Sequence, residues 1–159
     1  MSLATTLTQS DQNHPPLVLI HGLGSAATAF KPIIPTLAQS FRVITVDLPG
    51  HGQSPYNKAQ GMDPKSLGRA IFESVESKYG ISKFHVAGNS LGGWIALEMA
   101  ADQPQRIKTL TGLAPAGLWL KPSSGRVPSE AQSYYLAKVL RPLIRVGLHI
   151  IALRKIGYA

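Results

Sequence analysis

The chain has 159 residues, of which 44% are hydrophobic and 15% are charged; this size and composition suit one globular domain and exclude a disordered segment. It contains no cysteine, which excludes disulfide bonds, thiolate metal sites and a cysteine nucleophile. No stretch approaches the roughly 20 apolar residues of a membrane span, and the first residues lack the basic start and apolar run of a secretory signal. We therefore expect a cytoplasmic protein.

The positive charge is concentrated toward the carboxyl end. Of the net charge of +8 at pH 7, residues 1–120 carry +2 and residues 121–159 carry +6. Basic segments can bind nucleic acid or anionic membranes. Here the basic residues are interleaved with many aliphatic ones, so we expect no nucleic-acid partner. The stretch 134–156 is typical of a helix packed on an apolar surface, with a helix at a lipid surface as the alternative.

Strands and helices are predicted in strict alternation. An all-apolar run indicates a buried strand at 17–20, and β-branched residues indicate another at 42–47. Asp63 fits the N-cap of a helix that ends at Gly80. The predicted elements, in chain order, are strand 17–20, helix 30–41, strand 42–47, helix 64–79, strand 83–87, helix 91–102 and strand 106–113.

This alternation predicts a parallel sheet, because consecutive parallel strands need crossover connections. Three loops rich in glycine follow predicted strands, at residues 21–24, 47–54 and 88–92. Each begins at the carboxyl end of its strand. We therefore expect the three loops to converge at one edge of the sheet, which is where such sheets bind ligands.

The most informative motif is Gly88-Asn89-Ser90-Leu91-Gly92. It follows an apolar strand and precedes a predicted helix, which is the context of a nucleophile elbow, a tight turn that exposes a serine hydroxyl. Its two glycines fit a turn too tight for a Cβ atom. Ser90 is therefore the candidate nucleophile, and the alternative is a small residue in a glycine-rich turn.

Together with its neighbours, this motif resembles the α/β-hydrolase family. The resemblance rests on three segments in the family's order: His21-Gly22-Leu23-Gly24, Asp47-Leu48-Pro49-Gly50-His51-Gly52-Gln53-Ser54 and Gly88-Asn89-Ser90-Leu91-Gly92-Gly93. It implies an α/β fold with an α/β-hydrolase-type, mostly parallel sheet and flanking helices, incomplete at four or five strands. It also implies that residues 1–118 form the amino-terminal part of the core and that residues 119–159 begin a helical cap.

The resemblance also assigns roles at the site. Ser90 would attack a substrate carbonyl, and the backbone amides of Leu23 and Leu91 would bind the oxyanion that forms. An amide at a helix N-terminus points outward and carries partial positive charge, which suits Leu91 to this role. Leu23 follows the first predicted strand, where the family places its second donor; the alternative is an ordinary apolar loop residue.

One part of the family pattern is missing from this sequence. The family places its catalytic acid after the seventh strand and its histidine after the eighth. The acidic residues that follow Ser90 here are Glu98, Asp102 and Glu130, and none fits that pattern. The chain therefore resembles an amino-terminal portion of such an enzyme that ends within the cap.

Several histidines and one aspartate are alternative candidates for the missing catalytic groups. His21 and His51 belong to motifs whose histidines are mostly structural in the family, and His149 is expected to be a packing residue of the cap. His85 is expected in the core or on a face of the sheet. Asp47 is expected to form hydrogen bonds within its own loop.

Two functions remain open on the sequence. The first is a serine hydrolase that cleaves an ester, thioester, amide or carbon–carbon bond of a small apolar carbonyl compound, with low activity alone. The second is an inactive fragment or a binding protein without the triad acid and histidine. Neither implies a cofactor, and no clustered metal ligands or dinucleotide fingerprint are present. Strand 106–113 would leave an unpaired edge, so self-association is also expected.

Overall fold

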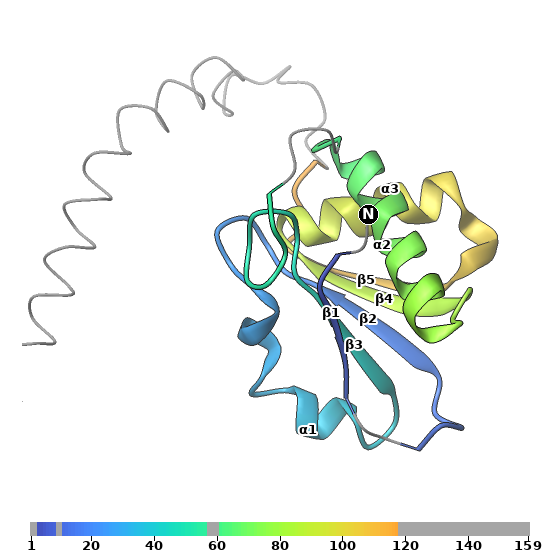
Figure 1. The fold of residues 1–159 in the computed structure, drawn as a ribbon. Coiled ribbons are helices and arrows are strands. Elements are labelled where there is room, and N and C mark those ends of the chain that lie inside the picture. The colour runs from blue at the N-terminus through green and yellow to red at the C-terminus, as the bar shows by residue number, and fades with distance from the viewer. Residues whose placement is uncertain (1–2, 9–10, 57–60, 118–159) are drawn as a thin grey trace, which may run out of the picture. The chain divides into compact units, whose positions relative to one another are not determined.

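The structure is a computed structural model that describes residues 3–8, 11–56 and 61–117. In these residues a five-stranded sheet carries helices on both of its faces (Figure 1). The strands are β1 (Thr5–Leu7), β2 (Pro16–Ile20), β3 (Arg42–Val46), β4 (Phe84–Asn89) and β5 (Ile107–Leu113). The helices are η1 (Ala27–Phe30), α1 (Ile34–Leu37), α2 (Pro64–Tyr79), α3 (Leu91–Asp102) and η2 (Pro104–Arg106). The predicted cap at 119–159, with His149, lies outside the described residues.

The strands lie in the order β1-β3-β2-β4-β5. All neighbours are parallel except β1, which runs antiparallel to β3. Ile20 at the end of β2 lies opposite Val46 of β3 and Gly88 of β4, so the carboxyl ends of these three strands are level. The predicted parallel α/β sheet is therefore confirmed, and β1 supplies its fifth strand.

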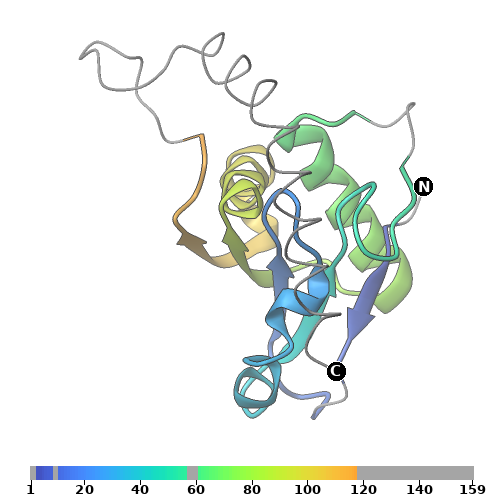
Figure 2. The same ribbon diagram turned by 90° about the vertical axis from the view of Figure 1, so that its left-hand side faces the viewer.

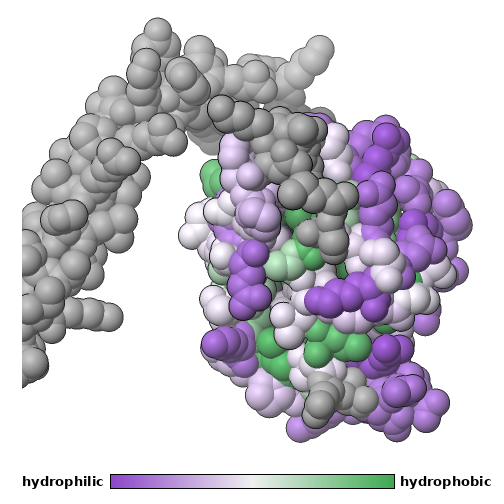
Figure 3. Space-filling view, viewed as in Figure 1, coloured by the Kyte–Doolittle hydropathy of each residue, from purple (hydrophilic) through white to green (hydrophobic). Residues whose placement is uncertain are grey.

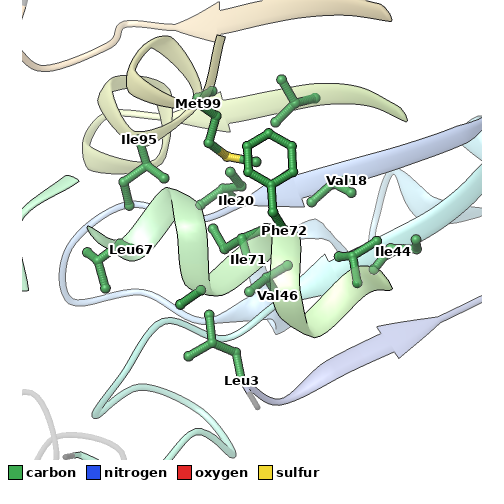
Figure 4. Close-up of a cluster of buried hydrophobic side chains, with 14 of the residues drawn as sticks. Leu3, Val18, Ile20, Ile44, Val46, Leu67, Ile71, Phe72, Ile95 and Met99 are labelled. Atoms are coloured by element: carbon green, nitrogen blue, oxygen red, sulfur yellow. The ribbon is translucent and has the colours of Figure 1, made fainter. Parts of the chain in front are cut away.

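The core forms because successive strand residues point to opposite faces of the sheet. Val18 and Ile20 face α2 and α3, whereas Leu17 and Leu19 face η1 and α1 on the other side (Figure 2). Figure 4 shows the larger cluster, to which α2 contributes Leu67, Ile71 and Phe72, α3 contributes Ile95 and Met99, and β3 contributes Ile44 and Val46. Each of these side chains is almost completely buried.

Helix α2 begins and ends where the sequence predicts. The Asp63 side chain accepts a hydrogen bond from the Ser66 amide at 2.9 Å, and Pro64 occupies the first turn. Gly80 ends the helix with φ at 66°, a left-handed conformation that glycine adopts without steric cost.

Helices α2 and α3 pack closely, which fixes the helix that follows Ser90. A Cβ atom on Gly68 would lie 2.6 Å from Cγ of Met99, so glycine is needed at this crossing. At the surface, Asp102 of α3 pairs with Arg69 at 2.9 Å and with Lys65 at 3.1 Å. These two cations hold the pKa of the Asp102 carboxyl well below its usual range. In the view of Figure 3, hydrophilic residues gather on the right-hand side of the described part of the chain.

The helix expected at residues 30–41 is not formed as predicted. Residues 27–30 form the short η1, and α1 is a single turn at Ile34–Leu37. Pro32 and Pro35 explain the difference, because proline donates no backbone hydrogen bond and disfavours a helical conformation in the preceding residue. Ile33, which lies within the predicted helix, is 47% exposed.

The two edges of the sheet differ. Strand β1 has three residues, and the Thr5 carbonyl accepts hydrogen bonds from the side chains of Lys78 and Tyr79. Strand β5 has seven residues, and within the described ranges it pairs with β4 alone. Its Leu113 carbonyl accepts from Ser90, so the backbone groups of Gly112 point away from β4. A long edge of this kind can add another strand.

We therefore expect the chain to self-associate through β5. A charged side chain on an edge strand opposes such pairing, so Thr111→Lys should reduce the associated fraction in sedimentation velocity over a range of concentrations. Thr6→Lys places the same charge on β1 and should leave the association unchanged. A wild-type chain that sediments as a monomer at every concentration would contradict this prediction.

Candidate active site

Ser90 lies between β4 and α3 in a strained conformation. Its φ is 52° and its ψ is −113°, a positive φ that residues with a Cβ atom rarely adopt. The turn is tight on both sides: a Cβ atom on Gly88 would overlap the carbonyl of Gly92, and one on Gly92 would overlap the carbonyl of Ile20. The motif thus forms the exposed strand-to-helix turn that its sequence predicts, and Ser90 itself is exposed.

The backbone of Ser90 is bound on both sides. Its N–H donates to the Leu113 carbonyl at 3.0 Å, and its carbonyl accepts from Trp94 N–H at 3.1 Å and from Ala116 N–H at 3.0 Å. In a trans peptide the C=O and the next N–H point in opposite directions. The Leu91 N–H therefore points away from these partners, and it donates to no acceptor in the described part of the chain.

The loop after β2 lies against Ser90. A Cβ atom on Gly22 would be 3.2 Å from that of Ser90. The Gly22 carbonyl accepts from His21 Nδ1 at 2.7 Å and from Ser25 N–H at 3.2 Å. By the same peptide geometry the Leu23 N–H points the other way, and no residue within 3–8, 11–56 or 61–117 accepts from it. The Leu23 side chain is 76% exposed.

His21 and His51 bind backbone groups through both ring nitrogens. His21 Nε2 accepts from Leu48 N–H at 3.0 Å while its Nδ1 donates to the Gly22 carbonyl. His51 Nε2 accepts from Gly24 N–H at 3.2 Å, and its Nδ1 donates to the Pro49 carbonyl at 3.0 Å. Both rings are therefore neutral and connect loop 21–24 with loop 47–54. This is the structural role expected of them, and neither ring has a free nitrogen to act as a base.

The neutrality of His21 should be visible as a pH effect. Burial lowers the pKa of His21, and the hydrogen bond to the Gly22 carbonyl only partly opposes this shift. Because the folded pKa lies below the ordinary value of 6.5, the unfolded chain binds the proton more readily, and stability from this group falls as pH drops below 6.5. In an NMR titration, the His21 ring resonances should therefore move at lower pH than those of a free imidazole.

A matched variant isolates this effect. His21→Phe keeps a ring of similar size but lacks both nitrogens, so its stability should depend less on pH below 6.5 than that of the wild type. Ring resonances of His21 that move at or above pH 6.5 would contradict the prediction.

Asp47 accepts one hydrogen bond within its own loop, as expected, and a second one from the start of η1. Its Oδ1 accepts from Ala27 N–H at 2.7 Å and its Oδ2 from Gln53 N–H at 3.0 Å. The Ser54 hydroxyl donates to the Asp47 carbonyl at 2.6 Å. Asp47 is 8% exposed, and both carboxylate oxygens are thus used in fixing loop 47–54 and the start of η1.

Among the described residues, the hydrogen bonds of the remaining candidate groups go to partners other than Ser90. His85 lies on the face of the sheet toward α1, where its Nδ1 is 2.8 Å from the Thr109 hydroxyl. Glu98 accepts from Trp94 Nε1 at 3.2 Å. Within the described ranges no three side chains are grouped as metal ligands, and no helix there is long and apolar enough to cross a membrane.

Sequence reasoning did not find the contact between Ser90 and the residues after β5. The groups that bind Ser90 there, the Leu113 carbonyl and the Ala116 N–H, belong to the backbone, so the residue types give no indication of them. The only signal was the run Ala114-Pro115-Ala116-Gly117, whose proline and glycine marked the end of the strand.

This fold is that of an α/β hydrolase, and the chain belongs to the α/β-hydrolase family. A family model described as the alpha/beta hydrolase fold matches residues 15–146. A putative carbamate hydrolase RutD from Stutzerimonas stutzeri is 35% identical over 109 residues, which are 69% of this chain and 40% of that protein. A pimeloyl-[acyl-carrier protein] methyl ester esterase from Legionella pneumophila is 37% identical over 98 residues, 62% of this chain and 37% of that protein.

Solved structures agree with this assignment. A hydrolase from Pseudomonas aeruginosa superimposes with a TM-score of 0.71 at 28% identity, covering 87% of this chain and 49% of that one. The chain spans less than half the length of each of these relatives. These three relatives are named as hydrolases or esterases, and each is matched over less than half of its length.

Proposed function

We propose that the protein is a serine hydrolase in which Ser90 attacks the carbonyl carbon of a small apolar substrate. The observation that carries the proposal is the geometry of Ser90, which is exposed in a strained turn at the N-terminus of α3. An acyl-enzyme would form as the leaving group departs, and water would then release the acid. The esterase and carbamate hydrolase names of the relatives support cleavage next to a carbonyl.

The oxyanion would be bound by the amides of Leu23 and Leu91. Both N–H groups are held in place, because the carbonyl on the other side of each peptide accepts two hydrogen bonds. Such preorganised donors stabilise the charge that develops in the transition state. Removing one donor of this kind typically lowers kcat about 10²–10³-fold.

An apolar substrate is supported by the side chains around Ser90. Leu23 is 76% exposed and follows Gly22, which lies against Ser90; Leu113 is 48% exposed, and its carbonyl binds the Ser90 N–H. Exposed apolar side chains around a few oriented polar groups are typical of ligand sites. The side chains of Leu23 and Leu113 carry no charge, so a neutral acyl group fits better than an anionic one.

A serine hydroxyl is a weak nucleophile unless a base removes its proton. His21 and His51 are occupied, so the base and its acid would come from outside the described residues. Removing triad members costs about 10⁴–10⁶-fold in rate. We therefore expect low activity from this chain alone.

The test is labelling with a fluorophosphonate, read by intact mass. The wild-type chain should gain one label, and Ser90→Ala should gain none. Ser77→Ala should label like the wild type, because Ser77 is an exposed residue of α2 whose hydroxyl donates to the Ser74 carbonyl. An ester panel would then define the substrate.

The second candidate is a protein that binds an apolar ligand or partner without catalysis. The occupied ring nitrogens of His21 and His51 favour it. A folded wild-type chain that takes up no label would contradict the hydrolase and support this candidate.

A further inference from the structure

We propose that the β5 exit segment, residues 113–117, is the positioning element that holds Ser90 and aims the Leu91 N–H. This inference rests on the proposed function, because it concerns the same site. It assigns a role to a stretch of chain that contributes no functional side chain.

The first observation is a pair of hydrogen bonds that run in both directions. Ser90 donates its N–H to the Leu113 carbonyl, and Ala116 donates its N–H to the Ser90 carbonyl, each at 3.0 Å. One short segment therefore binds both backbone polar groups of the nucleophile residue.

The second observation is that the segment is itself fixed. Ala114 has a φ of 44°, the second positive φ of a non-glycine residue within the described ranges, besides Ser90. Pro115 packs so closely on α3 that a Cβ atom on Gly93 would lie 2.7 Å from its Cβ. Gly117 has a φ of 80° and lies on the Trp94 ring, with no room for a Cβ atom.

These contacts explain how the strain at Ser90 persists. A residue with a Cβ atom keeps a positive φ only where its surroundings over-determine the backbone. Here the Ser90 carbonyl is shared by Trp94 N–H and Ala116 N–H. A rotation of the Ser90–Leu91 peptide would break both bonds, so the Leu91 N–H is held outward. Without Ala116, Trp94 alone would hold this carbonyl.

Helix α3 and the β5 exit segment therefore have different roles at the elbow. Helix α3 supplies the Leu91 donor, and the β5 exit segment keeps its peptide from turning. Loss of the Ala116 N–H should therefore weaken the stabilisation of a negative charge on the residue 90 side chain more than it weakens the fold.

The experiment places a thiol at residue 90, because the thiol pKa reports how well the elbow stabilises a negative charge on that side chain. The chain has no cysteine, so Ser90→Cys introduces a single thiol at the N-terminus of α3. Donors at such positions lower a thiol pKa from about 8.5. The pKa and the alkylation rate are read with iodoacetamide as a function of pH, which requires no triad base.

On this background Ala116→Pro removes the N–H, whereas Ala116→Gly is the conservative variant that keeps it. We expect Ala116→Pro to raise the thiol pKa and lower alkylation at pH 7 severalfold, since one pKa unit changes the thiolate fraction about tenfold. Ala116→Gly should keep the thiol pKa of the parent. Circular dichroism checks that both variants fold.

If Ala116→Pro does not fold, Gly117→Ala replaces it, because a Cβ atom there meets the Trp94 ring and displaces the segment while leaving every N–H in place. A folded Ala116→Pro or Gly117→Ala chain with the parent's thiol pKa would overturn the inference. Failure of the proposed function is read separately on the other chain: wild-type Ser90 then takes up no fluorophosphonate, while the thiol pKa of the Ser90→Cys chain still responds to Ala116→Pro.

Discussion

Gly92→Ala is expected to lower the free energy of unfolding by about 3 kcal/mol or more. Gly92 lies in the first turn of α3, and helix propensity alone would favour alanine there by about 1 kcal/mol. The opposite sign is expected because the added Cβ atom would overlap the Ile20 carbonyl and lie 2.7 Å from the His21 carbonyl oxygen. Both obstacles are backbone atoms, so α3 and the end of β2 would have to move apart.

Gly80→Ala is the matched control for this substitution. Gly80 has a φ of 66°, but nothing lies within 4 Å of an added Cβ atom. Its cost is therefore conformational only, about 1–2 kcal/mol. Urea unfolding followed by circular dichroism gives both values. A loss for Gly92→Ala no greater than that for Gly80→Ala would show that the close approach of α3 to β2 is not needed.

The elements best predicted from sequence are those specified by local signals. Asp63 and Gly80 fix the two ends of α2 through contacts with residues three or four positions away. The apolar run of β2 likewise needs only to be buried on both faces of a sheet. In such places the structure is determined by residues that are close in the sequence, so the sequence pattern alone is enough to predict it.

The region around α1 shows where local signals conflict. Apolar residues at helical spacing favoured one helix over residues 30–41, while Pro32 and Pro35 opposed it. The prolines prevail because each removes a backbone donor, and the apolar side chains Ile34, Leu37 and Phe41 still reach the core from a single turn and a loop.

The site was predictable in its residues but not in its connections. Asp47 and His21 were expected to hold loops, yet their partners Ala27 and Leu48 are 20 and 27 residues away and contribute only backbone N–H groups. Backbone donors are the same in every residue type except proline, so no sequence pattern identifies them. Folding alone brings these donors to the carboxylate and the ring.

Asp47→Ala tests how far these connections hold the site together. Asp47 is nearly buried, and its carboxylate is the acceptor for the N–H groups of Ala27 and Gln53. Leaving a buried donor unpaired costs about 1–3 kcal/mol, so we expect Asp47→Ala to lower the free energy of unfolding by about 2–4 kcal/mol. Asp47→Asn, which retains one carbonyl oxygen, should fall between alanine and the wild type.

Asp63→Ala provides the comparison, since Asp63 also accepts a backbone N–H but does so at the surface. Its unpaired donor can bond to water, so its loss should be clearly smaller than that of Asp47→Ala in the same urea titration. Equal losses in the free energy of unfolding would mean that loop 47–54 keeps its conformation without the Asp47 carboxylate. A larger loss at Asp47 would instead show that its carboxylate stabilises the fold through loop 47–54. Loop 47–54 also carries His51, whose ring binds the Gly24 N–H. Asp47 would therefore also support loop 21–24, which places Gly22 against Ser90.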